Sequence, residues 1–111
     1  MYLIDTHSHI YYDAYKNNLD QVINRALENN IKKIICVGVD LKTSEKSIKI
    51  AEKYDCIYAT VGYHPHDSKT VNQNYLKEIE NLYSHDKVVA IGEIGLDYYY
   101  KYSSKKKQLI V

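Results

Sequence analysis

Short apolar runs alternate with amphipathic segments along the whole chain. The apolar runs are typical of strands, whereas the segments between them repeat their apolar residues with the 3.6-residue period of a helix. The predicted strands cover residues 2–5, 32–39, 56–65 and 87–97, and the predicted helices cover residues 19–30, 44–54 and 74–83. Strands that are apolar throughout are usually buried on both faces, in a parallel sheet covered by helices. The pattern therefore predicts an α/β fold built from strand–helix repeats.

The three predicted helices differ in how clearly they face a core. The first has one apolar face that ends at a pair of asparagines, and this face consists of Leu19, Val22, Ile23, Ala26 and Leu27. The second is less clearly amphipathic, and Thr43 or Ser44 is positioned to cap its start. The third is expected to turn four residues inward, namely Leu76, Ile79, Leu82 and Tyr83.

The composition is that of one globular domain without a strong overall charge. Hydrophobic residues make up 45% of the 111 residues and charged residues 26%, which excludes a disordered chain. The 15 basic and 14 acidic residues leave a net charge of +1, so any contact with nucleic acid or lipid must be local. The 13 tyrosines, without Phe or Trp, fit a bias in nucleotide composition, and tyrosine can fill a core when its hydroxyl reaches a partner.

Two cysteines and the lack of long apolar segments indicate a cellular location. Cys36 and Cys56 lie within apolar runs and are expected to be buried free thiols, as in a reducing compartment. The sequence shows no signal peptide and no apolar run of the roughly 20 residues that a membrane span needs. We therefore expect a cytoplasmic protein that has no membrane partner.

Polar side chains suited to chemistry follow each apolar run. They are His7 and His9 after the first run, Asp40 after the second, His64 and His66 after the third, and Glu93 and Asp97 in the fourth. The carboxyl ends of parallel strands open onto one face of such folds, and functional groups gather there. The sequence thus predicts one shared site, although each residue taken alone could equally be a solvated loop side chain.

The first histidine pair and the glutamate have the chemistry of metal ligands. His7 and His9 are two residues apart, so both imidazoles point to the same side of an extended segment. Neutral imidazoles bind divalent transition metals, and a carboxylate such as that of Glu93 can ligate one cation or bridge two. Gly92 and Gly95 flank Glu93 closely and leave room for a ligand or another backbone to approach.

A second histidine pair lies in the motif GYHPHD. His64 and His66 flank Pro65, which stiffens the turn. These two histidines could bind phosphate, orient a leaving group or join the metal ligands. His85, by contrast, closes a polar helix end, and we interpret it as a surface residue.

Three motifs, DTHSHI at the start, VGYHPH in the middle and AIGEIGLDYYY near the end, together resemble the TatD-related hydrolases of the amidohydrolase superfamily. The resemblance extends over about residues 1–108. It implies a metal-dependent hydrolase on a TIM-type barrel, and members of the family are most often described as deoxyribonucleases, some acting from 3′ ends. DNA is then the expected substrate. The implied cofactors are divalent cations such as Mg²⁺, Mn²⁺ or Zn²⁺, two of them in the complete fold.

The resemblance also implies a role for each motif residue. The implied metal ligands are His7, His9 and Glu93, with Glu93 bridging the two cations. His64 would lie near the scissile phosphate as a catalytic residue. The implied roles of His66 and Asp97 are weaker, either in substrate binding or in supporting the site from behind the metal ligands.

The chain departs from the family in length. A TIM barrel usually needs about 250 residues for its eight strands, and this sequence provides four strands. Residues 1–111 are therefore expected to form the N-terminal half of an incomplete barrel, without the later histidines and the aspartate that is the family's expected general base. A truncated chain is the simpler explanation, and we expect it to bind metal weakly and to be weakly active or inactive.

Other functions stay open from the sequence. The same metal ligands serve other hydrolases of the superfamily, such as deacylases, and a non-catalytic half-barrel would also lack the later ligands. A four-strand half of a barrel would expose two sheet edges and the inner apolar face of its strands. These features favour self-association, by which two copies could close a barrel. Lys101 and Lys105–Lys107 could contact a nucleic-acid backbone or could be a solvated helix start.

Overall fold

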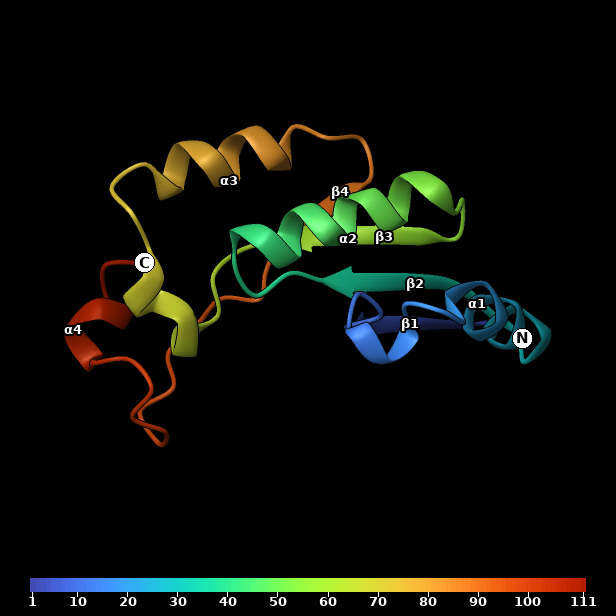
Figure 1. Cartoon of the computed structure of the whole chain (residues 1–111), viewed down its shortest axis with the longest axis horizontal. Helices are drawn as coiled ribbons and strands as arrows, with labels where there is room; N and C mark the ends of the chain where they lie inside the picture. The colour runs from blue at the N-terminus through green and yellow to red at the C-terminus, as the bar shows by residue number, and fades with distance from the viewer.

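Four strands run parallel, side by side and in chain order in the computed structural model, which describes residues 1–111 (Figure 1). The strands are β1 (Leu3–Ser8), β2 (Ile31–Val37), β3 (Ile57–Val61) and β4 (Val88–Ile91). The helices are α1 (Leu19–Glu28), α2 (Leu41–Lys53), α3 (Tyr75–Tyr83) and α4 (Lys105–Gln108), with short 3₁₀ helices η1 (Asp13–Tyr15) and η2 (Pro65–Thr70). A helix connects each strand to the next, which confirms the predicted α/β fold of strand–helix repeats.

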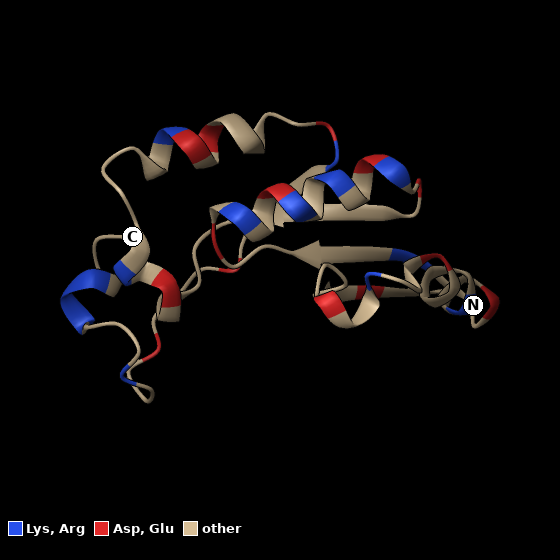
Figure 2. Ribbon diagram, in the orientation of Figure 1, with Lys and Arg blue, Asp and Glu red and all other residues tan.

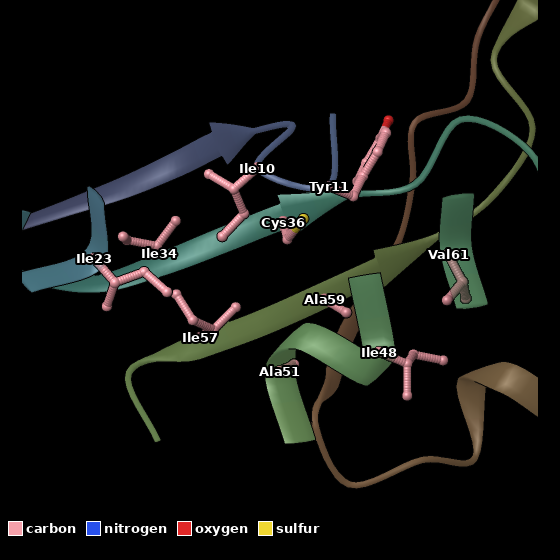
Figure 3. Close-up of a cluster of buried hydrophobic side chains, with 10 residues drawn as sticks. All are labelled: Ile10, Tyr11, Ile23, Ile34, Cys36, Ile48, Ala51, Ile57, Ala59 and Val61. Carbon is pink, nitrogen blue, oxygen red and sulfur yellow. The ribbon is translucent and has the colours of Figure 1, made fainter. Parts of the chain in front are cut away.

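The hydrophobic core lies between the sheet and the helices that cover one of its faces (Figure 3). In β3, Ile57, Ala59 and Val61 point to this face and are fully buried, as alternate residues of a strand can be. The rest of the core cluster comes from β2, the segment after β1, α1 and α2, and consists of Ile10, Tyr11, Ile23, Ile34, Cys36, Ile48 and Ala51. Each fully buried aliphatic side chain contributes about 1.5–3 kcal/mol, so this layer is the main source of stability.

The opposite face of the sheet is open, which corrects the prediction that the strands are buried on both faces. Ile4, Ile35, Tyr58 and Val89 line a shallow apolar depression there, together with Lys33. The side chains of Ile4 and Val89 are 47% and 48% exposed. Within the 111 residues no helix or strand lies over this face, so its apolar side chains remain in contact with water. An exposed inner face is what the sequence predicts for four strands of a barrel.

The last three strands end earlier than the apolar pattern predicts, whereas β1 continues to Ser8, past the predicted end at residue 5. The third and fourth runs were expected to extend to residues 65 and 97, but β3 ends at Val61 and β4 ends at Ile91. After Val61 the backbone turns away from the sheet, because the Gly62 N–H donates to Ser44 Oγ (3.2 Å) and Pro65 begins η2. The residues that follow each strand therefore form loops at the carboxyl-terminal edge of the sheet.

Asp40 caps α2, and this corrects the expectation that Thr43 or Ser44 does so. The Thr43 N–H donates to Asp40 Oδ1 (2.7 Å), and the Asp40 N–H donates to Thr43 Oγ1 (3.0 Å). This reciprocal pair is a capping box, with Thr43 at the third helical position. Asp40 is therefore occupied by the helix start and is not available as the strand-end site residue that its position suggested.

The helices bury narrower faces than their apolar patterns predict. In α1, Ile23 is buried, and Leu19, Ala26 and Leu27 pack beside it as predicted. In α3, only Ile79 and Leu82 pack against the core, whereas Leu76 and Tyr83, expected to face inward, are 67% and 50% exposed. The reason is that α3 lies beside α2 at the β3–β4 side of the sheet (Figure 1), so only one side of this helix contacts α2, β3 and β4.

Two further expectations meet the structure here. Both cysteines are free, but only Cys36 is buried, and this burial raises the pKa of its thiol. Cys56, expected to be buried as well, lies in the turn before β3 and is partly exposed. None of the helices has the length and apolar character that crossing a membrane would require.

Candidate metal centre

The two histidines of the first motif lie at the carboxyl end of β1. His7 is in the strand and His9 follows it, with their Nε2 atoms 3.2 Å apart. The His7 N–H donates to Asp5 Oδ1 (3.1 Å), and Ser8 Oγ donates to the Ile35 carbonyl of β2 (3.0 Å). These bonds fix the backbone that carries the two imidazoles.

Glu93 reaches the same point from the segment after β4. Its Oε2 lies 3.3 Å from His7 Nε2, and its Oε1 lies 3.3 Å from His64 Nε2. One ligand atom from each of His7, His9 and Glu93 lies within 4.8 Å of the other two. The structure therefore brings these three residues, which are up to 86 positions apart in the chain, to one edge of the sheet.

The hydrogen bond that His9 makes through Nδ1 leaves its Nε2 free for a metal. His9 Nδ1 lies 3.0 Å from the Val37 carbonyl, and a carbonyl can only accept, so we assign the proton to Nδ1. Nε2 of neutral His9 then carries a lone pair directed at His7 and Glu93. Histidine ligands in metalloproteins are held in this way by a hydrogen bond from the other ring nitrogen.

His64 is held in the opposite tautomer. Its Nδ1 accepts the His66 N–H (3.1 Å), so the proton of the neutral ring is on Nε2, the atom that faces Glu93 Oε1. In this form His64 is a hydrogen-bond donor at the site and not a metal ligand. His64 and Glu93 side chains are 21% and 32% exposed, so solvent and substrate can reach both.

Two of the three separations between the ligand atoms fit a divalent cation. Metal–nitrogen bonds of about 2.0–2.1 Å place neighbouring ligand atoms about 3.0 Å apart in octahedral geometry and about 3.4 Å apart in tetrahedral geometry. His7 Nε2 lies 3.2 Å from His9 Nε2 and 3.3 Å from Glu93 Oε2, between those values. Two imidazoles and one carboxylate are also a donor set used by catalytic metal sites, which leave further positions open.

His66 and Asp97 form a separate ion pair beside the metal ligands. His66 Nε2 donates to Asp97 Oδ2 (2.6 Å), and this hydrogen bond, with the N–H groups of Tyr99 and Tyr100, holds the pKa of Asp97 below its ordinary value. The His66 ring also lies against that of His64, with centroids 4.4 Å apart. The pair thus lies against the ring of His64.

Gln108 and Ser103 position this ion pair, and the sequence did not single out either residue. The Asp97 N–H donates to Gln108 Oε1, and Gln108 Nε2 donates to the Asp97 carbonyl, both at 2.8 Å. Ser103 Oγ donates to the His66 carbonyl (2.6 Å). Both side chains are almost fully buried. A polar residue in the last helix gives no sequence signal of such a role, because the role depends on where the loop returns.

Close backbone contacts set the depth of the site. A Cβ atom at Gly62 would lie 2.9 Å from the Gly92 carbonyl carbon, and one at Gly38 would lie 2.3 Å from Ser44 Oγ. The Glu93 N–H donates to the Gly38 carbonyl (2.8 Å). Glycine is therefore required at position 62 so that the segment carrying Glu93 can approach β3, and at position 38 so that Ser44 of α2 can pack against the end of β2.

Two polar or concave features lie elsewhere. His85 Nε2 contacts Glu52 Oε1 of α2 (3.0 Å), far along the sheet from the ligands. This agrees with the interpretation of His85 as a residue outside the site. The largest cavity, about 400 Å³, lies between η1 and α2 and is lined by residues such as Tyr12, Lys16 and Lys46. It contains none of the ligand residues, so it is separate from the candidate metal centre.

A parallel α/β sheet with imidazoles and a carboxylate converging at its carboxyl-terminal edge defines the class of barrel-type, metal-dependent hydrolases. The family model of the TatD-related DNases matches residues 4–111. The chain therefore belongs to the TatD-related DNase family.

Individual relatives agree with this membership. The chain is 42% identical over 106 residues to the uncharacterized metal-dependent hydrolase YabD of Bacillus subtilis, a match that covers 96% of this chain and 42% of that protein. It is 36% identical over 89 residues to the 3′-5′ ssDNA/RNA exonuclease TatD of Citrobacter koseri, covering 80% of this chain and 34% of the exonuclease. The crystal structure of a TatD family hydrolase from Entamoeba histolytica superposes with a TM-score of 0.88 at 33% identity, covering 99% of this chain and 43% of that one. The chain thus spans less than half the length of these relatives.

Proposed function

We propose that the chain supplies the N-terminal ligands of a divalent-metal site in a hydrolase that cleaves phosphodiester bonds in DNA. The observation that carries the proposal is the convergence of His7 Nε2, His9 Nε2 and a Glu93 oxygen within 4.8 Å. The substrate is supported by a relative whose name describes an exonuclease for single-stranded DNA and RNA. In this proposal residues 1–111 are the N-terminal half of a (β/α)₈ barrel.

His7, His9 and Glu93 would hold the cation. When bound, a divalent cation lowers the pKa of a water molecule and offsets negative charge on the phosphoryl oxygens. The cation would be of the Mg²⁺, Mn²⁺ or Zn²⁺ type, and Glu93, which directs Oε2 toward His7, would be the carboxylate that bridges two cations in the complete fold, as the family resemblance implies. A second cation would find only Glu93 among the grouped ligands of this chain, so we expect weak metal binding and weak or absent activity from the 111 residues alone.

His64 would act on the phosphate. Its Nε2–H faces Glu93 Oε1 at 3.3 Å, so a phosphodiester bound at a cation that Glu93 would hold lies within reach of this donor. There it can donate a hydrogen bond to a phosphoryl oxygen or to the leaving oxygen. His66 and Asp97 would position His64 through the ring contact and the 2.6 Å ion pair.

A metal titration combined with a nuclease assay tests the proposal. Calorimetric titration of the 111-residue chain with Mn²⁺ or Zn²⁺ should give one weak site, and Glu93→Gln should lower its affinity by about tenfold or more, because a ligating carboxylate becomes a neutral amide. His85→Ala is the matched control, since that histidine pairs with Glu52 away from the ligands. Any cleavage of a single-stranded oligonucleotide should require the metal and disappear in Glu93→Gln. Equal metal affinity in all three chains would contradict the proposal.

The same ligand set is compatible with a deacylase or another hydrolase of the superfamily, because the metal would activate water in each case. Parallel assays with a p-nitrophenyl ester and an oligonucleotide separate these reactions. A non-catalytic half-barrel is supported by the three-ligand limit of the site and by the open face of the sheet. Association of two copies through the edges of β1 and β4 remains part of that second proposal.

A further inference from the structure

A run of tyrosines follows Asp97 and remains largely outside the core. Residues 98–102, here called the tyrosine loop, read YYYKY. Tyr99 is 84% exposed, and the other three tyrosines are 43–56% exposed. The hydrogen bonds around the loop are made by its backbone and by Asp97, not by the tyrosine hydroxyls. The rings are therefore held in place by the loop, and folding leaves much of their surface exposed.

The rings lead from the tyrosine loop to the candidate metal centre. Tyr100 and Tyr102 stack with centroids 5.6 Å apart and planes 26° apart. The Tyr102 centroid lies 4.8 Å from that of His66, and His66 lies 4.4 Å from His64. His64 in turn faces Glu93 at 3.3 Å. A series of neighbouring rings, several of them steeply tilted to one another, thus ends at the carboxylate.

Lysines accompany the rings. Lys105 Nζ lies 4.8 Å from the Tyr98 ring centroid, and a depression of about 370 Å³ is bordered by Tyr98, Tyr100, Lys101 and Lys105. The adjoining α4 adds Lys106 and Lys107, so this end of the molecule is strongly basic (Figure 2). The nearest loop carboxylate, Asp97, is already paired with His66. The depression therefore combines aromatic faces with unneutralised positive charge.

We propose that the tyrosine loop binds single-stranded nucleic acid, with bases stacked on Tyr100 and Tyr102 and backbone phosphates held by Lys101 and Lys105. Aromatic faces that alternate with cations match a strand whose bases alternate with phosphates. A duplex keeps its base faces covered, so only an unpaired segment can use these rings. The identity of the ligand rests on the proposed function, and the inference adds the surface that would guide a strand end to His64.

Binding measured without metal tests the loop separately from hydrolysis. In EDTA, the fluorescence anisotropy of a labelled short thymidine oligonucleotide is compared with that of the same oligomer carrying abasic sites. Stacking on one aromatic side chain is worth about 1–3 kcal/mol per base, so Tyr100→Ala/Tyr102→Ala should weaken binding to the thymidine oligomer by about tenfold or more. Tyr100→Phe/Tyr102→Phe, which keeps both rings, should bind like the unaltered chain. All three should bind the abasic oligomer alike, and Lys105→Gln should weaken binding to both oligomers.

Each outcome decides the proposal. Equal binding of the thymidine oligomer by the alanine and unaltered chains would overturn it, and so would an equal loss on both oligomers or no binding by the unaltered chain. The same loss in the phenylalanine variant would also overturn it, because the rings would then not be the cause. Base-dependent binding in EDTA, together with a metal affinity that Glu93→Gln leaves unchanged, would support the tyrosine loop and reject the proposed metal centre. Loss of metal affinity in Glu93→Gln without base-dependent binding would do the reverse.

Discussion

Hydrogen bonds give His9 and His64 different chemical roles, although both residues are histidines. The Val37 carbonyl holds the proton of His9 on Nδ1, whereas the His66 N–H holds the proton of neutral His64 on Nε2. One ring is thereby prepared to donate a lone pair to a cation and the other to donate a hydrogen bond. The residue type and its place in a motif were readable in the sequence, but the tautomers were not, because a main-chain group supplies each partner.

At the same scale, Asp97 makes the stability of the chain sensitive to acid. Its pKa lies below the ordinary 3.8 chiefly because His66 donates a hydrogen bond to the carboxylate. A lowered folded-state pKa contributes stability that is present above the unfolded-state pKa and is lost as the pH falls through the folded-state value. We therefore expect the difference in unfolding free energy between the unaltered chain and Asp97→Asn to be largest near neutral pH and to shrink below pH 3.8. Urea unfolding at several pH values measures this difference, and a gap that stays constant with pH would contradict the expectation.

At the scale of the elements, the start of α2 is hydrogen-bonded to the end of β3. Asp40 caps the helix, and one turn later Ser44 Oγ accepts the Gly62 N–H. The strand–helix order and most of the helix bounds followed from the apolar periodicity. The cap did not, because an aspartate after a strand is equally consistent with a site residue, and only the fold shows that Thr43 is its partner.

Removing the cap should cost stability at this element. Asp40→Ala leaves the first N–H groups of α2 without an acceptor, and we expect a loss of about 1 kcal/mol in unfolding free energy. Asp40→Asn is the matched control, since its amide oxygen can still accept from Thr43 and should keep most of the stability. Urea denaturation monitored by circular dichroism reports both values. A loss in Asp40→Asn as large as that in Asp40→Ala would show that charge, and not the capping hydrogen bond, is responsible.

Taken as a whole, the molecule is a curved sheet that is covered on one face only. The family resemblance and the strand order predicted this architecture. The position of the tyrosine loop and of α4 could not be predicted, because they are held by long-range polar contacts such as that of Lys69 N–H with Ser103 Oγ (3.1 Å). Likewise, periodicity located Leu76 on an apolar stripe but could not reveal that nothing packs against it.

The open face and the free edges of β1 and β4 should cause self-association that increases with concentration. Val89→Lys places a charge on the open face and should shift the chain toward monomer in sedimentation velocity experiments. Leu76→Lys, on α3 and outside that face, is the control and should not change the distribution. A discrete dimer would favour closure of two sheets around one axis, and a broad range of sizes would favour edge-to-edge pairing. Monomer at every concentration would contradict the expectation.

The meeting of Gly62 with Gly92 has a consequence for how the centre can vary. A Cβ atom placed on Gly62 would lie 2.9 Å from the Gly92 carbonyl carbon, so the two main-chain segments are in direct contact with no side chain between them. The separation of the second histidine motif from Glu93 is then dictated by peptide geometry alone. Substitutions of the surrounding side chains can change the polarity of the centre and its affinity for particular ions, while the spacing of the reactive groups stays the same.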